Sequence, residues 1–283
     1  MRKNIVYWIC LFALAFPSCK KDSEGSGLKA VFSYVADGYK VNFTNFSTNA
    51  TEYRWDFGDQ SGDISTSKTP QHIFTQKGDY LVTLVAKNGK DSSTFKDTVS
   101  IIGPNIKIDG DFTDWQYVGY THQNAAGYNS TLLAVKTFAS ADNIYFLIEG
   151  TTGMNMEMFD MYIDADNNTA TGFATWLYPA GSGANYLCEG SPYGGWGDIY
   201  LHNGAPTDFS WTPVATFADA MQFSALTTKG AKKIVEFSIK KSVLGTTKGF
   251  VNFAFLELNS GWSDIGRLPE SQDPGSKFIA IPL

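Results

Sequence analysis

The chain has 283 residues, of which 43% are hydrophobic, 15% aromatic and 18% charged. This composition excludes a disordered or coiled-coil protein, and the length allows two domains. The net charge of -6, from 22 basic and 28 acidic residues, argues against nucleic acid as a partner. Abundant glycine and aromatic residues, with short β-branched runs, predict an all-β protein.

A secretory signal is predicted over residues 1–18. Arg2 and Lys3 precede an apolar stretch over residues 5–16 that is too short to span a bilayer. The stretch ends in Ala-Phe-Pro-Ser-Cys, which resembles a bacterial lipobox, and Cys19 would then be the lipidated first residue. This resemblance implies an outer-membrane lipoprotein that meets the membrane through its lipid only. An ordinary signal peptide that contains a cysteine is the alternative.

Residues 19–27 are rich in glycine, serine and charged side chains, which predicts a flexible tether. They resemble the segment that follows the lipidated cysteine in surface-exported lipoproteins of Bacteroidota-type bacteria, which implies a place on the cell surface. With Cys19 lipidated, Cys188 has no partner for an intramolecular disulfide. We therefore expect Cys188 to be a buried, inert thiol.

Residues 28–103 are expected to form a small β-sandwich, because apolar and polar residues alternate in short runs between glycines. Three segments closely resemble the signature of a PKD domain: Tyr-Arg-Trp-Asp-Phe-Gly-Asp at 53–59, Pro-Gln-His-Ile-Phe at 70–74 and Gly-Asp-Tyr-Leu-Val-Thr-Leu at 78–84. The resemblance implies an immunoglobulin-like fold that serves as a spacer or adhesion module, without catalysis.

The Trp-Asp-Phe-Gly-Asp segment of this domain can be interpreted in two ways. Trp55 and Phe57 alternate into the core, and the acidic residues Asp56 and Asp59 then lie in a tight turn. They could bind a cation, but acidic turn residues usually hydrogen-bond their own backbone. We favour the structural turn, and we expect His72 to be a strand residue rather than a ligand.

Residues 104–283 are expected to form a larger, jelly-roll-like antiparallel β-sandwich. An alternating strand at 106–109 runs into an Asp-Gly turn and a buried Trp115. One short helical turn ended by glycine is expected at 242–245. Further strands are expected at 132–139, 144–149, 158–164, 184–189, 198–202, 214–217, 221–225, 234–239, 251–258 and 278–281.

The Ile-Asp-Gly and Asp-Trp elements at 108–115, and the strand Asn-Ile-Tyr-Phe-Leu at 143–147, resemble family 9-like carbohydrate-binding modules and their DOMON-type relatives. The resemblance implies carbohydrate binding. DOMON-type relatives can also hold haem, for which the candidate axial ligands are His122, His202, Met154, Met156 and Met158.

An acidic loop after the strand at 158–164 is a candidate Ca²⁺ site. Side-chain oxygens of Asp164, Asp166 and Asn168 and the carbonyl of Ala170 stand at relative positions 1, 3, 5 and 7. Flanking helices and a closing glutamate are missing, so other ligands would come from distant residues such as Glu149, Glu189 or Asp198. The alternative is an acidic turn whose side chains bind only backbone groups.

Aromatic residues stand beside glycine-rich turns in the same region. A sugar site combines rigid aromatic surfaces with a few polar groups, because sugars present apolar C–H faces and hydroxyl edges. We assign Trp115, Trp211 and the Phe253–Phe255 pair to packing. The candidate platforms are Trp176, Tyr178, Tyr193, Trp196 and Trp262, with Asp198, Asp264 and Arg267 as hydroxyl partners.

A glycoside hydrolase is the main catalytic alternative, because it needs two carboxylates across a cleft. Candidates exist at Glu149, Glu189, Glu236 and Glu257, but alternation predicts that Glu236 and Glu257 face solvent. The sequence also lacks the short motifs of metalloproteases, α/β-hydrolases and phosphate loops. We therefore predict a non-catalytic, lipid-anchored surface protein that captures poly- or oligosaccharide. The other alternative is a structural or protein-interaction module of a surface complex.

Overall fold

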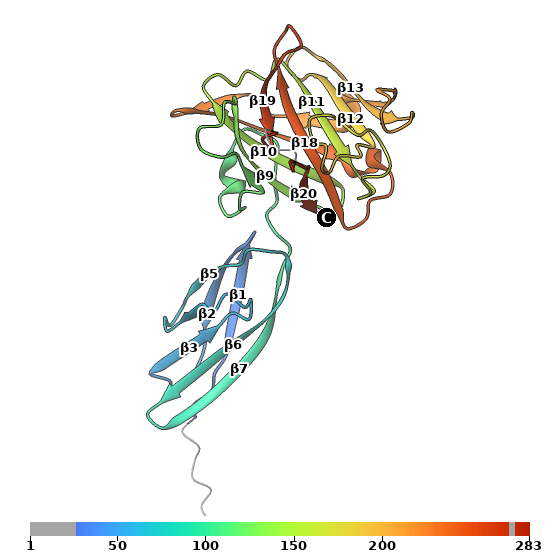
Figure 1. Cartoon of the computed structure of the whole chain (residues 1–283). Coiled ribbons are helices and arrows are strands. Elements are labelled where there is room, and N and C mark those ends of the chain that lie inside the picture. The colour runs from blue at the N-terminus through green and yellow to red at the C-terminus, as the bar shows by residue number, and fades with distance from the viewer. Residues whose placement is uncertain (1–26, 272–274) are drawn as a thin grey trace, which may run out of the picture. The chain divides into compact units, whose positions relative to one another are not determined.

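A computed structural model describes residues 27–271 and 275–283. The predicted signal peptide, Cys19 and the tether up to residue 26 lie outside these described residues. The described chain is nearly all β, with antiparallel sheets, and it divides into two compact units (Figure 1). Within the described ranges, no helix has the length and hydrophobicity needed to cross a bilayer.

The N-terminal domain is an immunoglobulin-like sandwich, as the sequence predicts. Its three-stranded sheet has the order β1-β2-β5, and its four-stranded sheet has the order β4-β3-β6-β7. The strands are β1 (Phe32–Asp37), β2 (Lys40–Asn45), β3 (Glu52–Asp56), β4 (Ile64–Ser65), β5 (Gln71–Ile73), β6 (Gly78–Asn88) and β7 (Asp91–Ile101).

Aromatic side chains form the core of this sandwich. The rings of Phe32, Phe43 and Trp55 have centroids 5.1 to 5.8 Å apart, and the Trp55 indole N–H donates to the carbonyl of Ser67 at 2.9 Å. Asp56 Oδ1 accepts a hydrogen bond from the Gly58 N–H at 3.0 Å. The acidic segment is therefore built as the local turn that the sequence favours.

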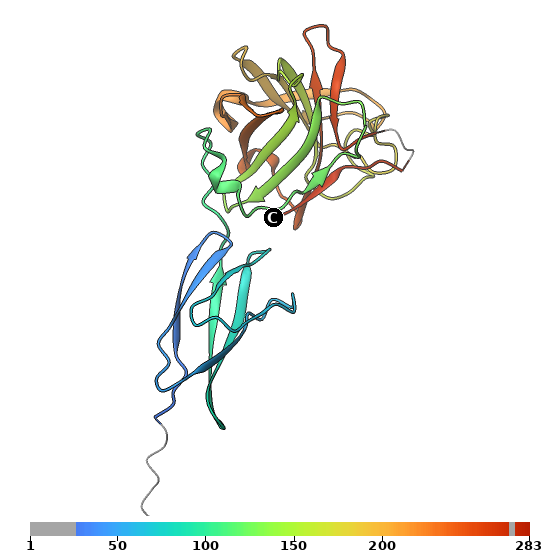
Figure 2. The same ribbon diagram turned by 90° about the vertical axis from the view of Figure 1, so that its left-hand side faces the viewer.

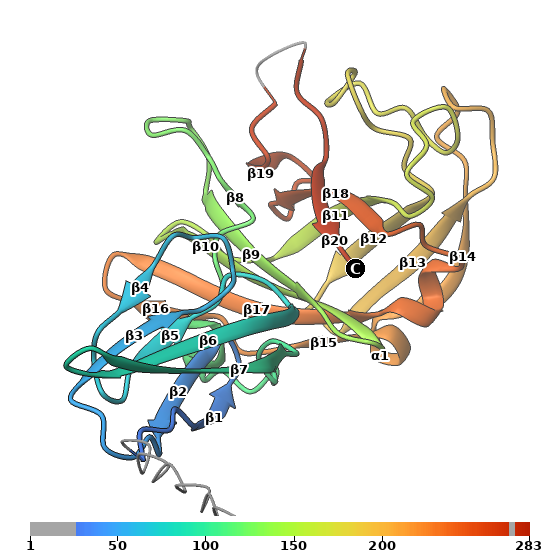
Figure 3. The ribbon, with the colours of Figure 1, turned by 90° about the horizontal axis from the view of Figure 1, so that it is seen from below.

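The C-terminal domain, residues 104–283, is called the distal domain, and it is a sandwich of two larger sheets. The six-stranded sheet has the order β15-β17-β10-β9-β8, with β16 paired to β17. The seven-stranded sheet has the order β14-β13-β12-β11-β18-β19, with β20 paired to β18. Figure 2 shows β9 and β10 (green) side by side, and Figure 3 labels the strands of both sheets.

The distal strands largely follow the predicted ranges. They are β8 (His122–Gln123), β9 (Leu132–Ala139), β10 (Asn143–Thr151), β11 (Met158–Asp164), β12 (Tyr186–Ser191), β13 (Trp196–His202), β14 (Trp211–Thr216), β15 (Met221–Phe223), β16 (Thr227–Lys229), β17 (Lys232–Lys240), β18 (Phe250–Leu258), β19 (Asp264–Leu268) and β20 (Ile279–Pro282). Short helical turns occur at η1 (Phe112–Trp115), α1 (Phe217–Ala220) and η2 (Lys241–Leu244).

The main core lies between the two distal sheets. Every second residue of the central strands points inward, so β10 and β17 bring Phe146 and Phe237 together with ring centroids 4.7 Å apart. On the inner face of the seven-stranded sheet, Phe159 of β11 stacks on Phe255 of the neighbouring β18, with ring centroids 4.9 Å apart. Burying each such ring contributes about 1.5 to 3 kcal/mol, so this layer supplies most of the domain's hydrophobic stabilisation.

A second apolar cluster lies on the outer face of the seven-stranded sheet. Met158 and Tyr162 of β11 point outward, and the chain after β11 folds back over them through Phe173 and Tyr178. The fold-back closes where the Phe173 N–H donates to the carbonyl of Ala184 at 2.8 Å. This segment covers β11 and its neighbours, while the outward side chains of β13 stay half-exposed.

Two predictions about the first strand and about Glu236 are wrong. Residues 106–108 are not a strand; the Lys107 N–H donates to the Asp114 carboxylate, and the Gln222 amide donates to the carbonyl of Ile108. Glu236 is completely buried and accepts hydrogen bonds from the backbone N–H of Asp109 and Gly110 and from the Trp115 indole, at 2.7 to 3.0 Å. A buried carboxylate needs such donors, and here they anchor the opening segment to the sheet.

The prediction that Glu257 faces solvent is also wrong. Its side chain is also completely buried. It accepts the backbone N–H groups of Asn155 and Met156 at 2.6 and 2.8 Å, together with the hydroxyl of Thr131. The alternation of β18 places this residue toward a loop rather than toward water, and the carboxylate fixes that loop.

Candidate functional site

Two exposed indoles meet at one end of the distal sandwich. Trp196 opens β13 and Trp262 lies in the turn between β18 and β19. Their ring centroids are 6.1 Å apart with planes inclined by 48°, and their exposed fractions are 46% and 54%. Two tryptophans that remain this open while packed together form an apolar surface patch, which is characteristic of a binding surface.

The turn that carries Trp262 is held in an unusual backbone conformation. Trp262 has φ of +61°, in the left-handed region that costs a non-glycine residue about 1 to 3 kcal/mol. Asn259 Oδ1 accepts the N–H groups of Gly261 and Ser263 at 2.9 and 3.1 Å and so stabilises the turn. These bonds hold the backbone that carries the Trp262 indole.

Tyr193 stands in the turn before Trp196. Its ring is 46% exposed, and its hydroxyl donates to the carbonyl of Ser224 at 2.9 Å. Burial of that hydroxyl raises the pKa of Tyr193 to about 12. The ring therefore keeps a fixed position while one part of it faces solvent.

Trp196 lines two hollows in the surface. One has a volume of about 530 Å³ and includes Asp198, Thr216 and Phe217. The other has a volume of about 430 Å³ and includes Glu157 and Tyr193. Both combine an aromatic wall with polar groups at the rim, which suits a ligand that has apolar faces and hydroxyl edges.

Three carboxylates stand in a row across the outer face of the seven-stranded sheet. Asp160 of β11 pairs with Glu189 of β12, which pairs with Asp198 of β13. Burial, followed by the charge and hydrogen bond of Glu189, raises the pKa of Asp160 to about 7. In the described part of the chain, Asp160 Oδ1 is buried without a hydrogen-bond partner. The row ends at Asp198, which follows Trp196 by two residues on β13.

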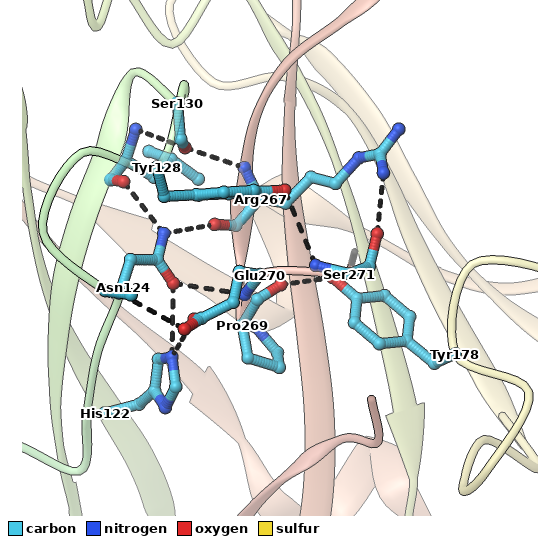
Figure 4. Close-up of polar contacts among 11 residues, drawn as sticks. His122, Asn124, Tyr128, Ser130, Tyr178, Arg267, Pro269, Glu270 and Ser271 are labelled. Atoms are coloured by element: carbon cyan, nitrogen blue, oxygen red, sulfur yellow. Dashed lines mark hydrogen bonds and ion pairs between the residues drawn. The ribbon is translucent and has the colours of Figure 1, made fainter. Parts of the chain in front are cut away.

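Arg267 lies in a different, more polar hollow. Its guanidinium is paired with Asp264 and donates to the Ser271 hydroxyl at 2.6 Å. Arg267 and Asp264, with Tyr128 and Asn129, line a hollow of about 500 Å³. Figure 4 shows the surrounding network. The sequence predicted both Arg267 and Asp264 as hydroxyl partners in the sugar site. In the structure they pair with each other, and they line a hollow that Trp196 and Trp262 do not line.

The neighbouring His122 belongs to the network in Figure 4. Its Nε2 lies 2.8 Å from Glu270 Oε2 and 3.1 Å from Asn124 Oδ1. His202, the other haem candidate, is engaged with the carbonyl of Asp208 at 2.9 Å. The methionine candidates Met154 and Met156 are buried in the inner core and Met158 in the outer cluster.

Tyr178 is a correction to the predicted site. Its ring is completely buried, and its hydroxyl donates to the carbonyl of Pro269 at 2.6 Å. It packs against Phe278 in the outer cluster. A ring without an exposed face cannot stack on a sugar, so Tyr178 is part of the packing that fixes the covering segment.

Trp176 has the opposite environment, although it is only two residues away. It is 71% exposed and touches Phe173, with ring centroids 6.0 Å apart. Phe173 in turn contacts a group of rings near the end of β13. These rings are His202, Phe209 and Trp211. Trp176 is thus part of a second aromatic group, distinct from the Trp196–Trp262 pair.

The acidic loop begins at the buried Asp164. Asp164 accepts from the Asn252 amide at 3.1 Å, and Asp166 accepts the Asn168 N–H at 3.1 Å. Burial raises the pKa of Asp164, hydrogen bonds from Asn252 and Asn168 lower it, and nearby Asp166 raises it again. Asn168 Oδ1 accepts the Ala170 N–H at 3.2 Å. The described residues hold no group of three or more His, Cys, Asp or Glu placed for a metal ion.

Cys188 is completely buried, and burial raises the pKa of its thiol. This agrees with the predicted inert thiol, because a protonated thiol away from solvent is a poor nucleophile.

Sequence reasoning missed Asp160, Tyr200 and Phe209. Asp160 and Tyr200 share the outer face with Asp198, and only strand register reveals that. Alternation within each strand was the available signal, but it could not show which strands are neighbours.

The N-terminal domain matches a known family. Residues 27–101 match the PKD domain. Over 91 residues the chain is 34% identical to the pre-pro-metalloprotease PrtV of two Vibrio cholerae serotype O1 strains, a match that covers 30% of this chain and 10% of the relative. The chain therefore spans about a tenth of the length of these curated relatives.

Three solved structures are also similar to this chain. The PKD1 domain of the Vibrio cholerae metalloprotease PrtV is 32% identical, covering 26% of this chain and 96% of that one, with a TM-score of 0.25. The PKD1 domain of Vibrio anguillarum Epp is 30% identical, covering 26% of this chain and 93% of that one, with a TM-score of 0.25. A structure of carbohydrate-binding modules from the β-sandwich superfamily is 15% identical, covering 82% and 96%, with a TM-score of 0.25.

Proposed function

We propose that this chain is a lipid-anchored cell-surface protein that captures glycans without turning them over, with the PKD domain as a spacer. The observation that carries this proposal is the exposed pair of Trp196 and Trp262 beside two hollows. Aromatic faces can stack on the apolar C–H faces of sugars, and Asp198 and Glu157 at the rims can accept hydrogen bonds from hydroxyls.

The buried carboxylates support binding rather than hydrolysis. Glu236 and Glu257 are fully occupied as acceptors for backbone and side-chain donors. Asp160 stands directly opposite Glu189 on the neighbouring strand and is largely buried, whereas the two carboxyl groups of a glycosidase flank the scissile bond across an open cleft. Release of reducing sugar from any bound glycan would contradict the non-catalytic part of the proposal.

Glycan capture can be tested with the detergent-solubilised full chain on an array of plant, host and microbial glycans. Trp196→Ala is expected to weaken binding about tenfold or more, equivalent to about 1.4 kcal/mol, because it removes a stacking surface. Phe250→Ala is the matched control, since Phe250 is 45% exposed but lies at the far end of β18. If no glycan binds the wild-type chain, the proposal fails and a protein partner becomes the better explanation.

We also propose that Ca²⁺ binds the acidic loop. The adjacent carboxylates of Asp164 and Asp166 would gain a counter-charge, with Asn168 and the Ala170 carbonyl as further oxygen ligands. CaCl₂ should raise the unfolding temperature and chelator should lower it, because an ion that binds only the folded state stabilises it. Asp166→Asn should remove that shift while Asp142→Asn should keep it. Identical melting curves with and without CaCl₂ would contradict this site.

The lipid anchor has its own test. Cys19→Ala should abolish incorporation of labelled palmitate and release the protein from the membrane fraction, because a lipid chain would be the only attachment. External protease should degrade the wild-type protein on intact cells if it faces outward. Unchanged labelling in the variant would contradict anchoring through Cys19.

A further inference from the structure

We propose that the glycan site continues from Trp196 along the outer side of β13 to Trp176, so that it holds an interior segment of a linear, neutral glycan. This inference rests on the proposed glycan-binding function and names its substrate class. It is carried by the register of β13, the exposure of the rings at both ends and the charge between them.

The alternation of β13 sets out a continuous strip. Ile199 is fully buried in the inner core, so the residues at even positions, Trp196, Asp198, Tyr200 and His202, face outward. From residue 196 to 202, at roughly 3.3 Å per residue, the strip is about 20 Å long. That length exceeds one or two sugar rings, so a ligand that uses all of it is a chain.

The far end of the strip is built by two segments that meet there. The Ala174 N–H donates to the carbonyl of Pro206 at 2.7 Å, which ties the covering segment to the turn between β13 and β14. Phe173 contacts both Trp176 and His202, with ring centroids 6.0 Å away in each case. Phe173 therefore links Trp176, which is 71% exposed, to the last residue of the strip.

Between the two ends of the strip, aromatic and acidic side chains alternate. Tyr200 lies two residues from Asp198 and its hydroxyl is 3.4 Å from Asp198 Oδ2. Glu189 of β12 stands opposite Asp198 and continues the acidic row across the sheet toward β11. Rings at alternate positions suit the apolar faces of a sugar chain, and carboxylates accept hydrogen bonds from its hydroxyls.

The same carboxylates select against charged chains. An acidic polysaccharide would bring its own carboxylates or sulfates toward Asp198 and the neighbouring Glu189, and like charges in close contact are repelled. A neutral chain meets no such cost. The row therefore predicts neutral polysaccharides as ligands and polyuronates as non-ligands.

The experiment uses isothermal titration calorimetry, in which oligosaccharide ladders are titrated into the detergent-solubilised full chain. The ladders are size-separated fragments of xylan, mannan and laminarin, with polygalacturonate as the acidic comparator. Affinity is expected to rise by about tenfold or more from the disaccharide to the longest fragments of whichever neutral polymer binds, because added contacts accumulate along the strip. Polygalacturonate should not bind.

The variants separate the two ends of the strip. Trp176→Ala should weaken binding of the long fragments about tenfold but leave the disaccharide unchanged, whereas Trp196→Ala should weaken both. Phe250→Ala should change neither. If affinity is flat with length and Trp176→Ala has no effect, the extended strip is refuted while glycan capture stands. Tight binding of polygalacturonate refutes the selection for neutral chains, and no binding of any polymer refutes both proposals.

Discussion

Replacing Asp160 by asparagine should make the distal domain more stable at neutral pH and have little effect in acid. Asp160 is largely buried, stands opposite Glu189 and has its pKa raised to about 7. The ionised form is therefore unfavourable in the folded protein. An asparagine has nearly the same shape, carries no charge and can donate to Glu189 through its amide.

The magnitude and the sign of the expected change in the free energy of unfolding follow from proton linkage. The folded-state pKa of about 7 lies above the model value of 3.8, so the folded protein holds this proton more tightly than the unfolded chain. Wild-type stability is therefore lost as pH rises from about 4 to 7 and then levels off. A difference of about 3 pKa units corresponds to about 4 kcal/mol at most. Asp160→Asn should recover much of that amount at pH 8 and almost none at pH 4.

Urea unfolding from pH 4 to 8, followed by tryptophan fluorescence, measures the effect. Five of the seven tryptophans lie in the distal domain and one, Trp55, in the PKD domain, so the signal reports mainly on the distal sandwich. Asp142→Asn, at an exposed carboxylate between β9 and β10, is the control and should behave like the wild type. A gain from Asp160→Asn that is equal at all pH values, or absent at pH 8, would refute the reasoning.

Three further changes test the packing. Glu236→Ala should lower the free energy of unfolding by about 3 kcal/mol or more, because it strands buried donors; a loss below about 1 kcal/mol would contradict the anchoring role. Tyr178→Phe should cost about 1 kcal/mol and leave glycan affinity unchanged, and a drop in affinity would restore Tyr178 to the site. Gly197→Ala should lower the unfolding temperature by several degrees, since its φ is +152° and a Cβ would lie 2.3 Å from the Phe217 ring; an unchanged temperature would show that the ring can move.

Local periodicity predicted much of the fold. The expected strand at 158–164 is β11 and that at 132–139 is β9, residue for residue. The strand β19 was missed, because Asp264, Gly266 and Arg267 break the apolar alternation. Gly266 is required there because a Cβ would lie 2.2 Å from the Thr131 hydroxyl. That requirement comes from a neighbour far away in the chain, so no local pattern could reveal it.

The sequence by itself determined two β domains, the PKD signature and which residue types could bind a sugar, since these depend on neighbours within a few positions. Only the tertiary structure decided that Trp196 and Trp262 form a pair, that Tyr178 is buried while Trp176 is open, and that Glu236 and Glu257 point into the protein. Strand pairing and the folding of a loop over a sheet bring distant residues together, and burial is set by those long-range contacts.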